Sequence, residues 1–261
     1  MQLSLENKTA LVCGSTQGIG LAAARELALL GANCILLARN EGSLQTAVNS
    51  LDTSKGQEHS FAVADFSSPD AVKKAIEEIL LKHTISILVN NTGGPKPGPI
   101  IDADTDQFLN AFQQHVIVNQ LLTQAVVPGM KRLGYGRIIN IVSTSVKIPL
   151  NNLGVSNTIR GAVASWSKTM ANELGPFGIT VNNVLPGFTS TARLKSLAQS
   201  LAADKGITVE EQERSMAAEV PLKRFGKAEE TAALVAFLAS PAAAYITGTS
   251  IPVDGGRTGS L

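Results

Sequence analysis

The chain has 261 residues, of which 44% are hydrophobic and 16% are charged, so it is long enough to bury a large core without a disulfide or a metal. Its 22 basic and 21 acidic residues leave a formal net charge of +1, with no excess of positive charge for nucleic acid or a membrane surface. We therefore expect its partners to be small molecules and further copies of the chain.

The N-terminal residues and the cysteines indicate where the protein works. Glu6 and Lys8 precede a short apolar run, which is neither the layout of a signal peptide nor that of a membrane-spanning segment. Cys13 and Cys34 fall in predicted strands, where buried thiols suit core packing in a reducing compartment. The three histidines are scattered and none is paired with a cysteine or carboxylate at ligand spacing. The sequence thus predicts a cytoplasmic protein without a metal site.

Apolar runs alternate with amphipathic stretches along the whole chain. The runs predict seven buried parallel strands at Thr9–Cys13, Cys34–Ala38, Ser60–Ala64, Ile85–Asn90, Arg137–Val142, Ile179–Leu185 and Thr249–Val253. The stretches predict helices that include Gly20–Leu30, Pro69–His83, Gln107–Lys131, Asn157–Leu174 and Ala228–Ala239. This order predicts one α/β domain over residues 1–261, a Rossmann-type doubly wound parallel sheet with helices on both faces. The segment Thr189–Val220 is longer than a connection needs, which predicts a lid-like insertion over residues 189–220.

A glycine-rich turn follows the first predicted strand and opens the first helix. It reads Gly14-Ser15-Thr16-Gln17-Gly18-Ile19-Gly20. Glycines let the backbone approach a phosphate closely, and the positive end of a helix attracts a pyrophosphate. Because no Gly-Lys-Ser/Thr ending is present, a P-loop is excluded. The turn predicts a dinucleotide site, and the alternative is a glycine-rich turn that holds no ligand.

The spacing of these glycines resembles the T-G-x-x-x-G-x-G motif of the short-chain dehydrogenase/reductase family, with Cys13 in place of the threonine. The resemblance continues through Asn90-Asn91-Thr92-Gly93, through Pro186-Gly187 with Thr189 and Thr191, and through the closing stretch from Pro221 to Gly256. It implies that these segments bind the adenosine, support the central strand, bind the nicotinamide carboxamide and pack subunits together. The cofactor contacts that we predict from it are Gly14, Ser15, Thr16, Gly18, Ile19, Gly20, Arg39, Asp65, Phe66, Asn91, Thr92, Gly93, Arg160, Pro186, Gly187, Thr189 and Thr191.

Arg39 ends the second predicted strand, where an acidic residue would instead pair with the ribose hydroxyls of NAD. A guanidinium suits a 2′-phosphate, so the sequence favours NADP(H) over NAD(H), the alternative being an exposed arginine that serves solubility. Asp65, followed by Phe66, resembles the family's acid that meets the adenine amino group. Capping of the next helix together with Ser67 or Ser68 is the alternative role of that carboxylate.

By position, the family's catalytic asparagine, serine, tyrosine and lysine correspond to His115, Ser143, Ser156 and Arg160. Arg160 keeps a positive charge beside the ribose but does not shuttle protons, because an arginine pKa lies above about 12. Among groups that could relay a proton, His115 titrates near neutrality in water, and Lys147 would do so only if it were desolvated. A hydrogen-bonded core histidine and a solvated lysine are the alternative interpretations of these two residues.

The resemblance implies an NADP(H)-dependent oxidoreductase that interconverts a ketone and a secondary alcohol. In this hypothesis Ser143 polarises the carbonyl, Arg160 anchors the ribose, and Ser156, a bound water or Lys147 relays the proton. The similarity is greatest to the 3-oxoacyl carrier-protein reductases, which suggests a 3-oxoacyl thioester or another anionic or acyl-carrier-bound substrate. Lys96, Lys147 and Arg193 follow predicted strands at the edge where such a ligand would bind.

A second hypothesis is a catalytically silent protein that binds or senses the nucleotide, because three of the four catalytic positions are replaced. For assembly, the resemblance implies a homotetramer, with a dimer as the second choice, formed through the helices within Gln107–Lys131 and Asn157–Leu174.

Overall fold

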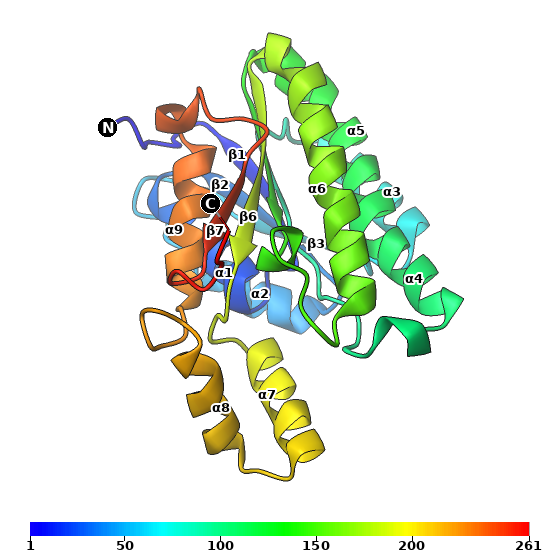
Figure 1. The fold of residues 1–261 in the computed structure, drawn as a ribbon. Helices are drawn as coiled ribbons and strands as arrows, with labels where there is room; N and C mark the ends of the chain where they lie inside the picture. Colours follow the sequence, from blue (N-terminus) through cyan, green and yellow to red (C-terminus); the bar gives the residue numbers. More distant parts are fainter. Residues whose placement is uncertain (261) are drawn as a thin grey trace.

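The seven apolar runs form one parallel sheet in the computed structural model, which describes residues 1–260 (Figure 1). The strands are β1 (Thr9–Cys13), β2 (Asn33–Ala38), β3 (Ser60–Val63), β4 (Ile87–Asn90), β5 (Gly136–Ile141), β6 (Ile179–Pro186) and β7 (Ser250–Val253). Their order in the sheet is β3-β2-β1-β4-β5-β6-β7. All neighbours are parallel, and the order in which the chain adds strands reverses between β1 and β4. The predicted doubly wound α/β fold is confirmed.

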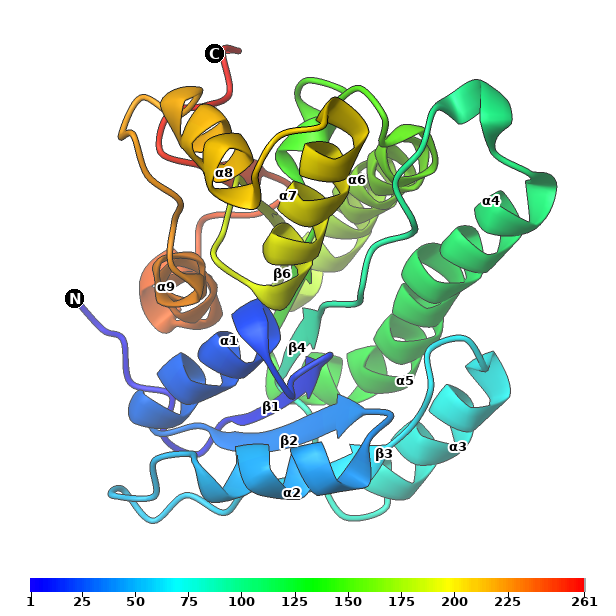
Figure 2. The ribbon, with the colours of Figure 1, turned by 90° about the horizontal axis from the view of Figure 1, so that it is seen from below.

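Helices cover both faces of this sheet (Figure 2). They are α1 (Gly18–Leu29), α2 (Glu41–Asn49), α3 (Pro69–Leu80), α4 (Thr105–Phe112), α5 (Val118–Leu133), α6 (Gly154–Leu174), α7 (Ala192–Lys205), α8 (Val209–Ala218) and α9 (Ala228–Ala239). Successive strand residues point to opposite faces, so Val12 packs against α1, α2 and α9, whereas its neighbour Leu11 packs against α3, α5 and α6. None of the helices in the described chain combines the length and the apolar character that a bilayer crossing needs.

A row of asparagine side chains crosses the second half of the sheet. The Asn90 Nδ2 group donates to Asn140 Oδ1 at 2.8 Å, and Asn140 Nδ2 donates to Asn183 Oδ1 at 3.1 Å. Asn183 Nδ2 then donates to Ser250 Oγ at 3.0 Å. All three asparagines are buried, and each uses its Nδ2 group as a hydrogen-bond donor within the core. The row links the end of β4 through β5 and β6 to the first residue of β7.

One expectation about the helices needs correction. The segment Gln107–Lys131, which the periodicity predicts as one helix, is interrupted by a π-helical turn, Gln113–Ile117, between α4 and α5. Helix α2 has only nine residues, with a glycine and few apolar positions. It forms because Asn40 caps it, its side chain accepting a hydrogen bond from the Ser43 N–H at 2.8 Å.

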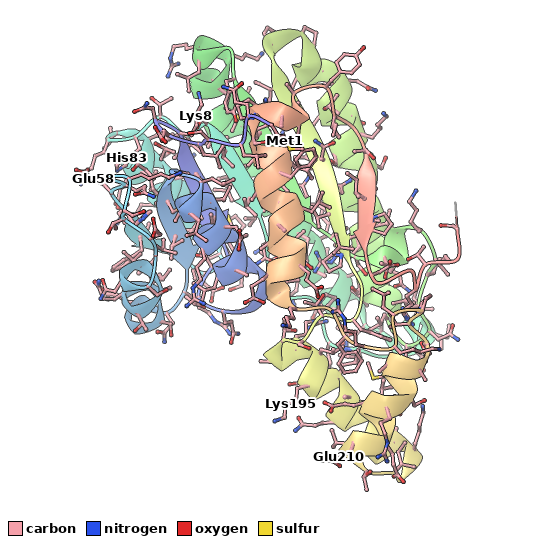
Figure 3. All side chains as sticks on the ribbon, turned by 90° about the vertical axis from the view of Figure 1, so that its left-hand side faces the viewer. Met1, Lys8, Glu58, His83, Lys195 and Glu210 are labelled. Carbon is pink, nitrogen blue, oxygen red and sulfur yellow. The ribbon has the colours of Figure 1, made fainter. Side chains whose placement is uncertain are left out.

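Most of the insertion at 189–220 is a helical pair, α7 and α8, that extends beyond the carboxyl edge of the sheet (Figure 3). Thr191 caps the start of α7, Gly206 ends it in the left-handed conformation, and Thr208 forms a capping box that starts α8. The pair has its own small apolar cluster, formed by Leu194, Ala198, Met216 and the side chains packed against them. The pair is thus built apart from the two main clusters of the core.

Candidate active site

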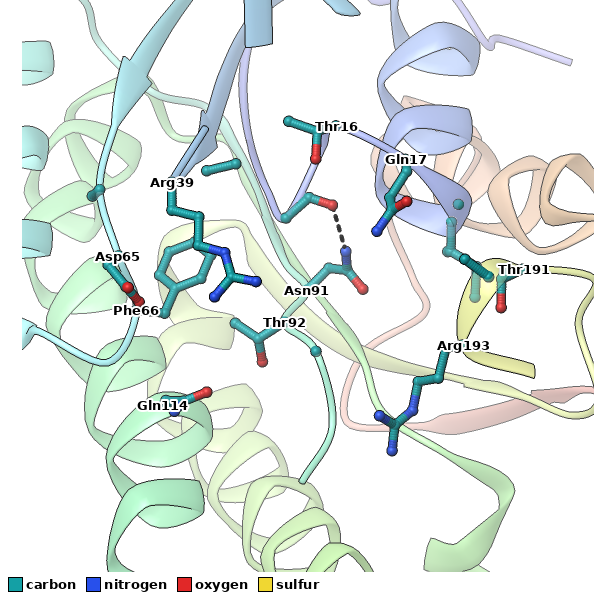
Figure 4. Close-up of a pocket in the computed structure, with 17 residues that line it drawn as sticks. Thr16, Gln17, Arg39, Asp65, Phe66, Asn91, Thr92, Gln114, Thr191 and Arg193 are labelled. Carbon is teal, nitrogen blue, oxygen red and sulfur yellow. Dashed lines mark hydrogen bonds between the residues drawn. The ribbon is translucent and has the colours of Figure 1, made fainter. Parts of the chain in front are cut away.

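The glycine-rich turn between β1 and α1 is shaped by contacts that admit no side chain. Gly14 and Gly18 have positive φ values of +57° and +56°, a conformation that residues with a Cβ rarely adopt. A Cβ on Gly14 would lie 2.5 Å from the Asn91 carbonyl oxygen, and a Cβ on Gly20 would collide with the Gly14 carbonyl. Asn91 Nδ2 donates to the Gly14 carbonyl at 3.1 Å, which ties the turn to the end of β4 (Figure 4). The turn is therefore a rigid cradle at the N-terminus of α1.

A cleft of about 350 Å³ opens beside this turn, along the carboxyl ends of β1, β2, β3 and β4. Parallel sheets of this kind bind ligands outside the carboxyl ends of their strands, where the strand order reverses. The reversal lies between β1 and β4, so the cleft occupies the expected position. It is lined by Gly14, Thr16, Gln17, Gly18, Ile19, Ala38, Arg39, Ala64, Asp65, Phe66, Asn91, Thr92, Gly93, Gln114, Thr191, Ala192 and Arg193.

One end of the cleft carries Arg39, Asp65 and Phe66 (Figure 4). Arg39 is exposed, and no group among residues 1–260 forms a hydrogen bond or an ion pair with its guanidinium. Asp65 accepts a hydrogen bond from the Ser67 N–H at 2.9 Å, and this bond, together with the nearby Arg39 charge, lowers the pKa of the carboxyl. Ser68, and not Asp65, caps α3. This end therefore offers a free cation next to an ionised carboxylate.

His115 lies in the π-helical turn and is 3% exposed. Its Nδ1 is 2.7 Å from the Thr92 hydroxyl, which joins the turn to the loop after β4. Burial, and next the positive charge of Arg160, lower the pKa of His115 to about 3. The ring is therefore neutral at physiological pH. One of its nitrogens is held by Thr92, a bond that fixes the orientation of both residues.

Ser143 lies in the segment after β5, and Ser156 and Arg160 lie on α6. Ser143 follows β5, and its Oγ accepts a hydrogen bond from the Ser145 N–H at 3.1 Å. Ser156 and Arg160 lie one turn apart on α6. Arg160 is buried and donates to the Ile141 carbonyl at 2.7 Å, two residues before Ser143. Burial and the neighbouring Arg193 lower its pKa to about 10, so the guanidinium stays charged at neutral pH.

The side chain of Arg193 spans the other end of the cleft. From the first turn of α7 it donates to the Gly94 carbonyl at 2.9 Å and to the Pro95 carbonyl at 3.0 Å. These carbonyls belong to the loop after β4, so one guanidinium joins the insertion to the opposite wall. Figure 4 shows this arginine across the cleft from Thr92. These two hydrogen bonds attach α7 to the wall of the cleft that follows β4.

The structure places the predicted residues in three groups. Eleven of the predicted cofactor contacts line the cleft, namely Gly14, Thr16, Gly18, Ile19, Arg39, Asp65, Phe66, Asn91, Thr92, Gly93 and Thr191. Ser15, Gly20, Arg160, Pro186, Gly187 and Thr189 are not among the residues that line it. Lys147, in the loop between β5 and α6, is exposed and lies outside the lining. Among residues 1–260, no three His, Cys, Asp or Glu side chains gather as metal ligands.

Several lining residues were not among the predicted contacts, notably Gln17, Gln114 and Arg193. Gln17 lies inside the glycine motif, which was itself a signal. Arg193 was singled out only as one of the basic residues on loops that follow strands. Gln114 carried no local signal, because an amide on a helix is usually a solvated residue. Its place depends on the π-helical turn, which the sequence pattern does not reveal.

Comparisons with known proteins agree with this geometry. The family described as "Enoyl-(Acyl carrier protein) reductase" matches residues 14–258. The 3-oxoacyl-[acyl-carrier-protein] reductase FabG of Pseudomonas aeruginosa is 34% identical, with 97% of this chain and 98% of that protein covered. The NADPH-dependent reductase BacG of Bacillus subtilis is 30% identical, with 98% of this chain and 100% of that protein covered.

Among solved structures, L-sorbose reductase of Gluconobacter frateurii, complexed with NADPH and L-sorbose, superimposes with a TM-score of 0.94. It is 33% identical, and the alignment covers 100% of both chains. A further structure described as a short chain dehydrogenase/reductase family protein is 31% identical over 100% of both chains, with a TM-score of 0.83. Because sequence, fold and glycine turn agree over nearly the whole chain, this protein belongs to the short-chain dehydrogenase/reductase family.

Proposed function

We propose that the protein is an NADP(H)-dependent oxidoreductase that interconverts a ketone and a secondary alcohol. The observation that carries this proposal is the cleft, in which a glycine cradle at the N-terminus of α1 lies beside the unpaired guanidinium of Arg39. The cradle accepts a pyrophosphate because no Cβ obstructs it, and Arg39 supplies the charge that a 2′-phosphate needs. When bound, the nicotinamide supplies or accepts the hydride. BacG and L-sorbose reductase, described with NADPH, support this choice of cofactor.

The other walls of the cleft would hold the rest of the cofactor. Asn91, Thr92 and Gly93 form the wall after β4, and Thr191 faces them from the start of α7. Arg160 uses one N–H group on the Ile141 carbonyl, and its remaining donors have no partner among residues 1–260. We assign those donors to the ribose hydroxyls. A buried cation without a carboxylate is costly, and a hydroxyl-rich ligand with a nearby phosphate would reduce that cost.

Ser143 and Ser156 are assigned to the carbonyl oxygen. The Ser143 oxygen already accepts the Ser145 N–H, so its own proton remains free to be donated to a substrate. Ser156 stands where the family carries its tyrosine, and Arg160 stands where it carries its lysine. A serine hydroxyl is a weaker acid than a phenol, so this atypical site would depend on the fixed charge of Arg160 to stabilise the developing alkoxide.

Neither His115 nor Arg160 has a pKa near neutrality. His115 is a neutral hydrogen-bonding group with a pKa of about 3, and Arg160 retains its proton with a pKa of about 10. We therefore assign the proton relay to Ser156 and a water molecule. Lys147 is exposed outside the cleft lining, so it would reach the oxygen only through a chain of waters. The expected cost of lacking a positioned acid is a turnover about 10²- to 10⁴-fold below that of an enzyme with one.

The first test is a titration of the protein with NADPH and NADH, followed by the fluorescence of the nicotinamide. We expect micromolar binding of NADPH and much weaker binding of NADH. Ketone reduction is then screened with 3-oxoacyl thioesters and ketoses, because relatives include 3-oxoacyl reductases and a sorbose reductase. Absence of saturation by either nucleotide would overturn the proposal. Tight NADPH binding without turnover of any ketone would support the silent nucleotide-binding protein instead.

We also propose that copies of the chain associate, with a homotetramer preferred over a dimer. Helix α6 carries the small residues Gly161, Ala162, Ala164 and Ser165, which permit close packing of another helix. Leu109 and Phe112 on α4 and Ile117 in the π-helical turn are large apolar side chains that are exposed. Light scattering during size-exclusion chromatography measures the mass directly, and a monomeric mass would contradict this proposal.

A further inference from the structure

The amide of Gln114 has no assigned role, although it lies in the cofactor cleft. Gln114 is half-buried and lines the cleft together with Asp65, Phe66 and Thr92 (Figure 4). No group among residues 1–260 forms a hydrogen bond with its side chain. A glutamine amide offers two donors and one acceptor oxygen. A ligand that fills this part of the cleft would displace water that hydrogen-bonds to the amide. Binding would then lose free energy unless the ligand formed hydrogen bonds to the amide in place of the water.

The residues on either side hold the backbone of Gln114 in place. Gln113 Nε2 donates to the Ser67 carbonyl at 2.6 Å, which attaches the π-helical turn to the loop after β3. His115, on the other side, is bonded to the Thr92 hydroxyl at 2.7 Å. Three consecutive residues thus contact the loop after β3, the cleft and the loop after β4. π-Helical turns are rare and often occur at functional sites, and this one sets Gln114 between two walls of the cleft.

The position of Gln114 along the cleft identifies the part of the ligand that it faces. In the proposed function the glycine turn holds the pyrophosphate and Arg39 the 2′-phosphate, while Thr191 and Arg193 line the opposite end of the cleft. Gln114 lies instead with Asp65 and Phe66, where an aromatic side chain lines a place for a planar base. An amide matches the adjacent donor and acceptor of adenine, its 6-amino group and N7. Ribose hydroxyls also donate and accept hydrogen bonds, so the test has to separate contact with the base from contact with the sugar.

We propose that Gln114 hydrogen-bonds the adenine base of the cofactor and contributes to its selection over other purines. This inference rests on the proposed function, because it assumes an adenine dinucleotide in the cleft. It differs from the carboxylate of Asp65, which carries a negative charge and accepts hydrogen bonds only. The amide can donate a hydrogen bond to N7 and accept one from the 6-amino group, so it contacts two atoms of the base.

The test compares Gln114→Leu with the native protein, since leucine fills similar space without hydrogen bonds. Gln124→Leu is the matched control, because Gln124 is exposed on α5 and lies outside the cleft lining. Calorimetry measures the dissociation constants of adenosine 2′,5′-bisphosphate and of the corresponding nebularine bisphosphate, which lacks the 6-amino group. We expect Gln114→Leu to weaken binding of the adenosine probe about five- to tenfold. The factor by which it weakens binding of the nebularine probe should be about three times smaller.

Each outcome is decisive. Equal losses for the two probes would show that Gln114 does not contact the 6-amino group, and would overturn the assignment of its amide to two atoms of adenine. No loss for either probe would do the same. If the native protein binds neither NADPH nor adenosine bisphosphate, the proposed function itself fails. If it binds both and only the Gln114 effect is missing, the proposed function stands without this inference. Thermal unfolding without ligand checks that both variants are folded.

Discussion

The buried neutral state of His115 predicts a specific loss of stability in acid. In the folded protein the pKa of His115 is lowered to about 3, whereas in the unfolded chain it is about 6.5. The unfolded state therefore binds more protons than the folded state between these two values. Stability that this residue contributes is fully present above about pH 6.5 and falls as the pH is lowered toward 3.

The magnitude follows from the same two values. His115 has an unfolded pKa of about 6.5 and a folded pKa well below 5. Its titration therefore makes the free energy of unfolding about 2 kcal/mol lower at about pH 5 than at about pH 7.5. For a chain of this length, that difference corresponds to a decrease of roughly 4–8 °C in the unfolding temperature. Other groups that titrate in this range add their own effects, so the comparison must isolate His115.

The assay is urea unfolding of the native protein and His115→Gln from about pH 7.5 to about pH 5, with stability extrapolated to water. Glutamine keeps hydrogen-bonding capacity near Thr92 but does not titrate. We expect the native protein to lose about 2 kcal/mol more than the variant over this range. His83→Gln is the control, because His83 is exposed and should behave as the native protein does. Parallel stability curves for the native protein and His115→Gln would refute the reasoning.

Three further variants test other parts of the site. Arg39→Glu should weaken NADPH about 10- to 100-fold with little loss of NADH, because it replaces a charge-assisted contact by repulsion of the 2′-phosphate; equal losses for both nucleotides in a binding titration would contradict that role. Arg193→Ala should raise the dissociation rate of NADPH about five- to 50-fold, since two hydrogen bonds that attach α7 to the opposite wall are lost. Stopped-flow fluorescence measures this rate, and an unchanged rate would show that the guanidinium does not hold α7 in place. Introducing the tyrosine and lysine that the sequence resemblance implies, with Ser156→Tyr and Arg160→Lys together, should increase turnover of a true ketone substrate by about tenfold or more. A double variant with intact NADPH binding but no gain in turnover would argue against the assigned proton relay.

Sequence reasoning located the features that depend on short stretches of chain. The strands were placed to within two residues, because a buried parallel strand needs a continuous apolar run. The glycine turn was also readable, since Gly14 and Gly18 adopt positive φ values that few other residues tolerate. Arg39 was identified because it directly follows β2, and ligands bind at the carboxyl ends of the strands in such a sheet.

The sequence by itself therefore determined the fold, the phosphate cradle and the sign of charge at Arg39, because each depends on local pattern and backbone conformation. Tertiary structure alone decided that His115 is neutral and bonded to Thr92, that Arg193 reaches Gly94, and that Gln114 faces the cleft. These contacts join residues far apart in the chain, or depend on a π-helical turn that the apolar periodicity passes over. A pKa lowered by burial likewise has no signature in sequence, since burial is created only when the helices pack on the sheet.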